Sequence, residues 1–217
     1  MRTLGLLLLA STLSAPLAAR ADGSIQLDLG AGIGKPFGQI QSGANASDAV
    51  AWEFPLQADV QFRFLKSFAA GPYVRYAPTT LASNLSNGCS AAGVSCDAMS
   101  LAFGVVGEYR FSDRLEGGPW LGALVGWEML KATTPQQGAS GGPLVKATST
   151  VSGVELGVRG GMDFELGGVT LGPWAALQAG QYSTQTVEMN GTSTSGGIAD
   201  KALHGTFQVG VRVSLLL

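Results

Sequence analysis

The stretch that decides the fold is Leu56-Gln57-Ala58-Asp59-Val60-Gln61-Phe62-Arg63-Phe64, in which apolar and polar residues alternate without a break. In an extended strand, side chains at every second position share one face. This stretch therefore has one apolar face and one polar face. The same two-residue period returns in seven other segments of the chain, which predicts an all-β protein built from two-faced strands.

The spacing of these segments predicts how the strands are connected. We expect strands at approximately 24–33, 52–64, 68–78, 98–111, 119–130, 150–165, 169–182 and 202–217. Long connections, at 34–51, 79–97, 131–149 and 183–201, then alternate with short ones, at 65–67, 112–118 and 166–168. An eight-stranded antiparallel up-and-down transmembrane β-barrel has this rhythm, with its short turns on the periplasmic side.

The first residues indicate export. Arg2 is followed by an apolar stretch around Leu6–Ala10, and Ala19-Arg20-Ala21 fits the small-x-small pattern of a signal cleavage site. We expect residues 1–21 to be a signal peptide and residues 22–217 to be one barrel domain. Removing Arg2 and Arg20 leaves 11 basic against 15 acidic residues, a net charge of −4. This mild acidic balance argues against nucleic acid as a partner, which would require a concentrated basic face.

The placement of glycine predicts which face points inward. Many glycines of the predicted strands fall on the polar face, where a narrow lumen must fit side chains from every strand. Aromatic residues gather at both ends of the apolar face, as in the interfacial belts of membrane barrels. We therefore expect the polar face to line the lumen and the apolar face to contact lipid. A soluble β-sandwich with aromatic residues at the ends of its core is the alternative.

The last predicted strand carries a further signature. From Leu203 to Leu217, the odd positions are apolar or glycine, and the chain stops inside the strand. This resembles the C-terminal assembly signal of Gram-negative outer-membrane barrels, with Leu217 where most members carry Phe or Trp. The whole mature chain resembles the small outer-membrane barrels typified by OmpA, OmpX and OmpW, although no motif selects one subfamily. The even number of strands and the short periplasmic turns place both termini in the periplasm. The resemblance implies insertion by the barrel assembly machinery and a monomer.

Charged residues of the strands fall mainly on the inward face. Arginine forms bidentate contacts with carboxylates, so we expect an ion-pair network that plugs the lumen. Its expected members are Asp28, Asp59, Arg63, Arg75, Glu108, Arg110, Glu128, Glu155, Arg159, Asp163 and Arg212. Glu165 is also expected to point inward, and Glu53 is expected near the outer rim. The register across turn 65–67 places Asp59 opposite Tyr73 and diagonal to Arg75, which predicts an ion pair between Asp59 and Arg75.

Lysine and cysteine belong instead to the predicted long loops. Lys35, Lys131, Lys146 and Lys201 lie in or beside these loops, where they could meet the phosphates of lipopolysaccharide or simply keep the loops soluble. Cys89 and Cys96 are close together in a polar stretch of an exported chain, which predicts a local disulfide. No cluster of His, Asp or Glu accompanies them, so a metal site is the weaker interpretation, and no cofactor is expected.

Three hypotheses for function remain open. The leading one is a non-enzymatic outer-membrane barrel with a structural role and surface loops for partner contact. The second is a narrow channel for small solutes. The third is a lipid A deacylase or acyltransferase centred on His204, the sole histidine, which shares the inward face with Thr206. Thr206 is a poor substitute for a serine nucleophile, and no orienting acid can be assigned from the sequence.

Overall fold

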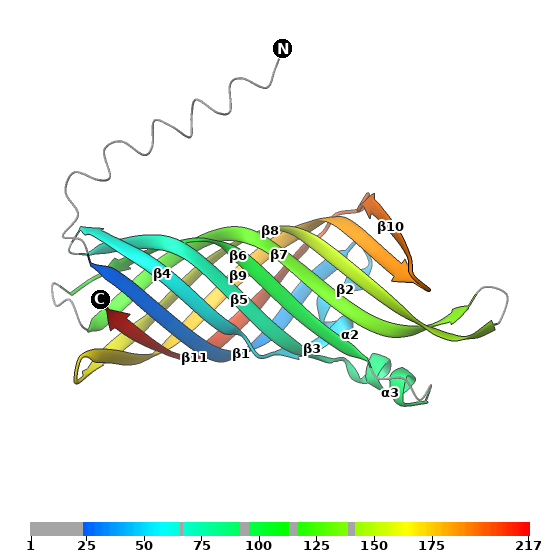
Figure 1. Ribbon diagram of the computed structural model, residues 1–217, viewed down its shortest axis with the longest axis horizontal. Coiled ribbons are helices and arrows are strands. Elements are labelled where there is room, and N and C mark those ends of the chain that lie inside the picture. Colours follow the sequence, from blue (N-terminus) through cyan, green and yellow to red (C-terminus); the bar gives the residue numbers. More distant parts are fainter. Residues whose placement is uncertain (1–23, 66, 92–95, 113–116, 139–141) are drawn as a thin grey trace, which may run out of the picture.

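The computed structural model describes residues 24–65, 67–91, 96–112, 117–138 and 142–217. In this part of the chain, eight antiparallel strands form a closed ring, as the alternation predicts (Figure 1). They are β1 (Ile25–Gln41), β4 (Leu56–Leu65), β5 (Phe68–Leu81), β6 (Asp97–Arg110), β7 (Gly118–Gly138), β8 (Gly142–Leu166), β9 (Val169–Met189) and β11 (Leu203–Leu216). Successive strands of the ring are paired, and the pairing of β1 with both β4 and β11 closes the barrel. The expected signal peptide lies outside the described residues.

The two ends of the barrel differ in construction (Figure 1). The terminal end carries the first described residues, the C-terminus and the short connections, such as the two-residue turn Gly167-Gly168, where both glycines have positive φ. The loop end carries the short elements β2 (Ala44–Asn45), α2 (Ala46–Ala49), α3 (Ser83–Ala91) and β10 (Thr192–Gly197). No helix in the described residues is both long and apolar enough to cross a membrane.

Three of the predicted long connections are largely strand, which corrects the expected boundaries. The β7–β8 ladder continues without interruption from the barrel wall to the pair Gln137↔Leu144, and β10 extends a hairpin from β9. Ser and Thr pair across these extensions, as in the contact between Thr186 Oγ1 and Ser195 Oγ at 2.8 Å. Strand pairing supplied by the neighbouring chain segments overrides the weak strand pattern of these polar residues.

Two further boundaries also differ from the prediction. The segment expected as a loop at 79–97 contains the helix α3. The strand expected at 52–64 is divided into β3 (Val50–Glu53) and β4 by Phe54 and Pro55. Pro55 has no amide hydrogen to donate to the ladder, but its carbonyl oxygen accepts a hydrogen bond from Gly32 N at 3.0 Å, so the wall remains connected there.

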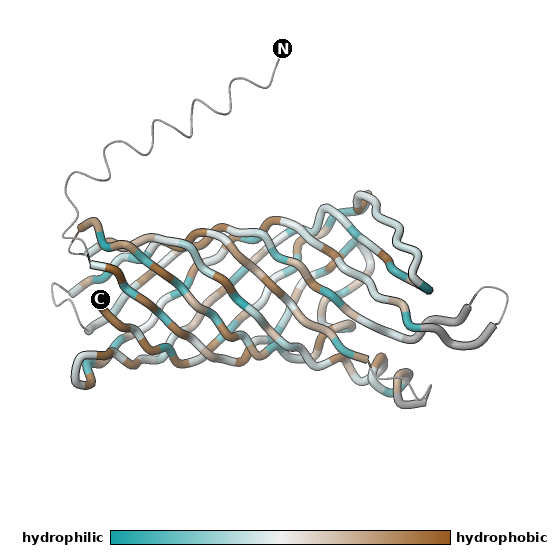
Figure 2. Tube along the Cα trace, in the orientation of Figure 1, coloured by the Kyte–Doolittle hydropathy of each residue, from teal (hydrophilic) through white to brown (hydrophobic). Residues whose placement is uncertain are grey.

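The two faces of each strand have opposite environments. On β4, Leu56 and Phe62 are each 54% exposed, whereas Asp59 is 2% and Gln61 is 0% exposed. Figure 2 shows hydrophobic residues along the barrel wall and paler, more polar residues in the β9–β10 hairpin at the loop end. The apolar face therefore points outward and the polar face fills the interior. This arrangement contradicts the alternative of a soluble sandwich with an apolar core.

Glycines of the polar face make room for large side chains inside the barrel. Gly104 and Gly126 are cross-strand partners on β6 and β7, and a Cβ atom at either would overlap the ring of Tyr73. Gly161 accommodates the indole of Trp120 in the same way. The aromatic rings thus occupy volume that the glycines leave free, which explains why glycine gathers on this face.

Candidate functional site

The lumen brings together the ionisable residues that the sequence places on the inward face. All of the expected members are buried: Asp28, Asp59, Arg63, Arg75, Glu108, Arg110, Glu128, Glu155, Arg159, Asp163 and Arg212. Two residues differ from expectation. Glu53 is buried within the lumen rather than at its rim, and Glu165 is exposed because it lies in the last residues of β8, beside the terminal turn.

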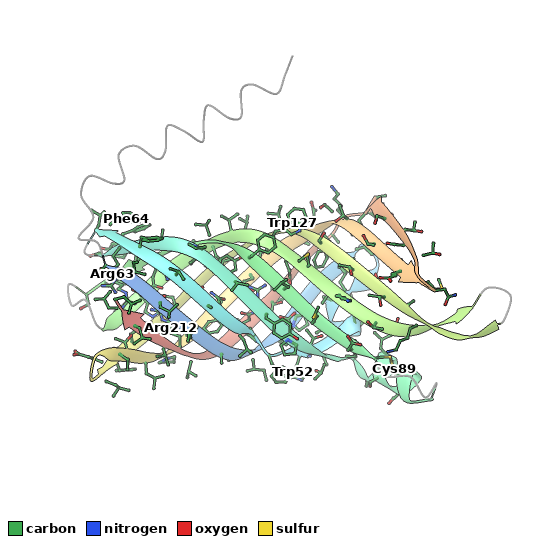
Figure 3. The ribbon with its side chains drawn as sticks, viewed as in Figure 1. Trp52, Arg63, Phe64, Cys89, Trp127 and Arg212 are labelled. Atoms are coloured by element: carbon green, nitrogen blue, oxygen red, sulfur yellow. A yellow bond between two sulfur atoms is a disulfide. The ribbon has the colours of Figure 1, made fainter. Side chains whose placement is uncertain are left out.

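Arg212 of β11 links two other strands near the terminal end (Figure 3). Its NH1 and NH2 groups donate hydrogen bonds to both carboxylate oxygens of Glu108, at 2.6 and 3.0 Å. Nε and NH2 also donate to Asp163, at 3.2 and 2.7 Å. The guanidinium carbon lies 3.5 Å from the ring centroid of Trp120. The guanidinium of Arg212 therefore forms bidentate ion pairs through its edges and a cation–π contact through its planar face.

Arg110 and Arg159 complete this region. Arg110 NH2 lies 3.1 Å from Glu108 and 3.1 Å from Asp163, so it bridges the same two carboxylates as Arg212. Arg159 NH1 donates to Asp59 Oδ2 at 2.6 Å. Each carboxylate of the group thus has at least one arginine partner.

Asp28 is held mainly by amides at the same end of the lumen. Gln26 Nε2 donates to both oxygens of Asp28, at 2.7 and 2.8 Å, and Gln61 Nε2 donates to one of them at 2.7 Å. Arg63 donates from Nε and NH2 to Gln26 Oε1, at 3.0 and 2.8 Å. We call Asp28, Asp59, Arg63, Glu108, Arg110, Arg159, Asp163 and Arg212 the terminal-end cluster.

The expected ion pair between Asp59 and Arg75 is not the one that forms. The register is as predicted, because Asp59 is the cross-strand partner of Tyr73. However, Asp59 binds Arg159, whereas Arg75 NH2 donates to Glu155 Oε2 at 2.7 Å and lies 3.8 Å from Glu128. In a narrow closed barrel, long side chains reach strands across the lumen as easily as the diagonal neighbour on the same wall.

A second group surrounds Arg75 toward the loop end. Tyr73 Oη donates to Glu155 Oε1 at 2.6 Å, and Ser100 Oγ donates to Glu128 Oε1 at 2.9 Å. Glu53 lies near Arg75, Glu128 and Glu155. We call Glu53, Arg75, Glu128, Glu155 and His204 the loop-end cluster.

His204 sits in this cluster with an acidic neighbour that sequence reasoning could not assign. His204 Nε2 and Glu128 Oε2 are 3.0 Å apart, and the imidazole stacks on Tyr182 with ring centroids 3.8 Å apart and an interplanar angle of 9°. The hydroxyl of Thr206 bonds to Glu53. In the described lumen, His204 and Thr206 therefore contact different carboxylates, Glu128 and Glu53.

The two clusters differ in their balance of charge. The terminal-end cluster contains four arginines and four carboxylates, whereas the loop-end cluster contains three glutamates around the single guanidinium of Arg75. Tyr73 of β5, Ala102 and Val106 of β6, and Leu124 of β7 form a separate buried cluster inside the barrel. The excess of carboxylates over arginines therefore lies in the loop-end half of the described barrel.

Packed side chains occupy the lumen at more than one level. An apolar cluster of Val50, Leu130, Val151, Tyr182 and Ile198 lies at the loop end, next to His204. A hollow beside Asp59, Trp120 and Arg212 has a volume of about 10 Å³, and another beside Arg63 and Arg110 is of similar size. A space of this size holds about one water molecule. In the described residues, no group of three His, Cys, Asp or Glu side chains is arranged to hold a metal ion.

Sequence reasoning missed the aromatic members of the lumen and did not include its amides in the expected network. Trp120 and Trp174 are buried between strands, and Tyr182 covers His204. The two-residue period could have revealed such residues, because side chains two positions apart in a strand share a face. Trp120 lies two residues before the inward Gly122, and Tyr73 lies two residues before the inward Arg75. Inward glutamines, such as Gln178 and Gln208, are also buried.

The predicted surface residues lie outside the lumen. Lys35, Lys131 and Lys146 are exposed within β1, β7 and β8 rather than in loops, and Lys201 is exposed beside β10. Lys35 Nζ donates to Ala51 O at 2.9 Å and lies 4.8 Å from the ring centroid of Trp52. The expected disulfide joins Cys89, within α3, to Cys96.

Comparison with known proteins supports the fold. No protein-family model matches the sequence, and no curated protein matches it. Among solved structures, a major outer membrane protein from Thermus thermophilus matches with a TM-score of 0.51 and 11% identity, over 88% of this chain and 99% of that one. OprG from Pseudomonas aeruginosa matches with a TM-score of 0.48 and 11% identity, over 90% and 97% of the two chains. The Neisserial surface protein A matches with a TM-score of 0.43 and 14% identity, over 88% and 96%. The chain therefore has the fold of a small eight-stranded outer-membrane β-barrel.

Proposed function

We propose that this protein is an integral component of the outer membrane, with a structural role and with its loop end available for contacts at the cell surface. The observation that carries the proposal is the distribution of residues, which is the reverse of that in a soluble protein. Apolar side chains lie on the outside of the barrel, and an ion-pair network lies inside. An outward face of this kind is stable in hydrocarbon and unfavourable in water. Closure of the ring also leaves no unpaired strand edge in the barrel wall.

The packed lumen supports a structural role over that of a channel. Arginines of the terminal-end cluster connect strands that are distant in the sequence, and each pairs with buried carboxylates or an amide. Moving such residues aside would separate opposite charges in a medium of low dielectric constant, which is costly. We therefore infer a barrel that does not conduct in its resting form and that has no catalytic role for His204.

Lipopolysaccharide is the lipid partner that we propose for the outward lysines. Lys35 lies beside Trp52 on the outward face, which is the arrangement expected for a residue pair at a membrane interface. Lys131 and Lys146 extend farther along the β7–β8 hairpin. Attraction to anionic lipid contributes about 1 kcal/mol for each basic residue near the surface. Both chain termini would then lie in the periplasm.

Conductance and orientation provide the tests. The protein, refolded in a planar bilayer, should show no stable conductance steps, and Lys131 and Lys146 in whole cells should react with a membrane-impermeant amine reagent. Steady single-channel openings of the wild-type protein would contradict the closed barrel. Lysines that react only after the outer membrane is opened would reverse the proposed orientation.

A further inference from the structure

The loop end contains a hollow that the lumen network does not use. It has a volume of about 300 Å³ and is open on one side. Its walls come from α2 and the end of β1, from Leu81 and Leu85, and from the extended parts of β7, β8 and β9. Pockets for small molecules span roughly 300–1,000 Å³, so this hollow is large enough for a small ligand, whereas the two hollows in the lumen each hold about one water molecule.

The hollow is lined mainly by aliphatic side chains, and four of its five polar side chains are paired with one another. Asn45 Nδ2 donates to Asp48 Oδ2 at 2.9 Å, and Gln185 Nε2 donates to Ser149 Oγ at 3.2 Å. Asp48 is the ionisable residue of the lining, and no lysine or arginine belongs to it. Nine of the fourteen lining residues are Ile, Leu, Val or Ala. An anion would meet the Asp48 carboxylate and no basic side chain, and the carboxylate already accepts a hydrogen bond from Asn45, so the lining favours an apolar molecule.

The floor of the hollow separates it from the polar lumen. Val50, Leu130 and Val151 line the hollow and also belong to the buried apolar cluster at the loop end. Tyr182 of that cluster stacks on His204, so the loop-end cluster begins directly beyond this layer. A molecule in the hollow is therefore separated from the polar lumen by a layer of apolar side chains.

We propose that this hollow is a binding site for a small uncharged apolar molecule, about the size of a two-ring aromatic hydrocarbon. The site lies within the barrel's own loop-end elements and does not require the lumen to open. The inference is independent of the proposed structural role, because it depends only on the folded loop end.

The test uses naphthalene and the full barrel in lipid nanodiscs, with ¹³C-labelled methyl groups on Leu, Val and Ala. The methyl resonances of Leu130 and Val151 should shift and then saturate as naphthalene is added. Because naphthalene also dissolves in lipid, the outward residue Val209 serves as a reference, and its resonance should shift in proportion to concentration without saturating.

Matched variants locate the site. Ala132 lines the hollow, so Ala132→Phe should fill it and weaken binding at least tenfold. Ala123 is exposed on the same strand, so Ala123→Phe should leave binding unchanged. Ala132→Asn adds a polar group with little volume and should weaken binding at least threefold, which keeps the test decisive if the phenylalanine variant does not fold.

Other occupants of the hollow would give different results. Shifts of Leu130 and Val151 that never saturate, or full binding by a folded Ala132→Phe or Ala132→Asn variant, would overturn the proposal. If these resonances respond to the acyl-chain length of the nanodisc lipid without naphthalene, a lipid chain occupies the hollow. If they change when a second copy shares the disc, the surface is an interface between copies. Either result would also overturn the proposal.

Discussion

Replacing Arg212 with alanine is the strongest test of the lumen network. The change removes four hydrogen bonds, two to Glu108 and two to Asp163, and the contact with Trp120. Removing one partner of a buried ion pair costs about 3–5 kcal/mol, because the other charge stays buried without compensation. Arg110 still lies 3.1 Å from both carboxylates, and a water-sized hollow adjoins Arg212. We therefore expect a loss near the lower end of that range, about 3 kcal/mol.

The assay is the free energy of unfolding in urea, measured by tryptophan fluorescence of the barrel in lipid vesicles. Glu108→Gln and the double variant complete a thermodynamic cycle, in which residues in direct contact usually couple by about 0.5–3 kcal/mol. Gln208→Ala is the matched control, since Gln208 is an inward, fully buried but uncharged residue of the same strand. An Arg212→Ala loss no larger than that of the control, together with additive free energies in the cycle, would refute the network.

Three further predictions address the outward face, the charge balance and the disulfide. Val209→Arg should lower the free energy of unfolding in vesicles by about 2–4 kcal/mol, which is the cost of a basic residue at the membrane midplane. Val209→Leu is the control and should be nearly neutral. Equal effects of the two changes would mean that this face does not contact lipid. Arg75→Ala leaves the three glutamates of the loop-end cluster without their arginine, so cation-selective conductance steps should appear in planar bilayers. A variant that shows no conductance would indicate that Arg75 does not seal the lumen. Replacing Cys89 and Cys96 with serine should leave the barrel folded, as judged by circular dichroism, because the bridge spans only 7 positions of the sequence. Proteolysis around α3 should become faster. Loss of the barrel would contradict this local role of the disulfide.

Period-two alternation was sufficient to predict the number of barrel strands, their order and most of the ionisable residues of the lumen. Asp59 and Arg63 share one face of β4 because the backbone turns each successive side chain to the opposite side, whatever the strand packs against. The same parity places Leu56 and Phe62 outward. The faces could therefore be assigned from local geometry, and the glycines of the polar face indicated which one would be inside.

Only the tertiary structure decided which charges pair and where the strands end. Arg212 meets Glu108 across 104 positions of the sequence, and Arg159 meets Asp59 across 100. Such contacts depend on the shear and diameter of the closed barrel, which alternation along one strand does not specify. The extended β7–β8 hairpin likewise depends on pairing between segments with weak strand patterns of their own. Alternation is a property of one strand, whereas ion pairs and ladder ends are properties of two or more strands brought together by ring closure.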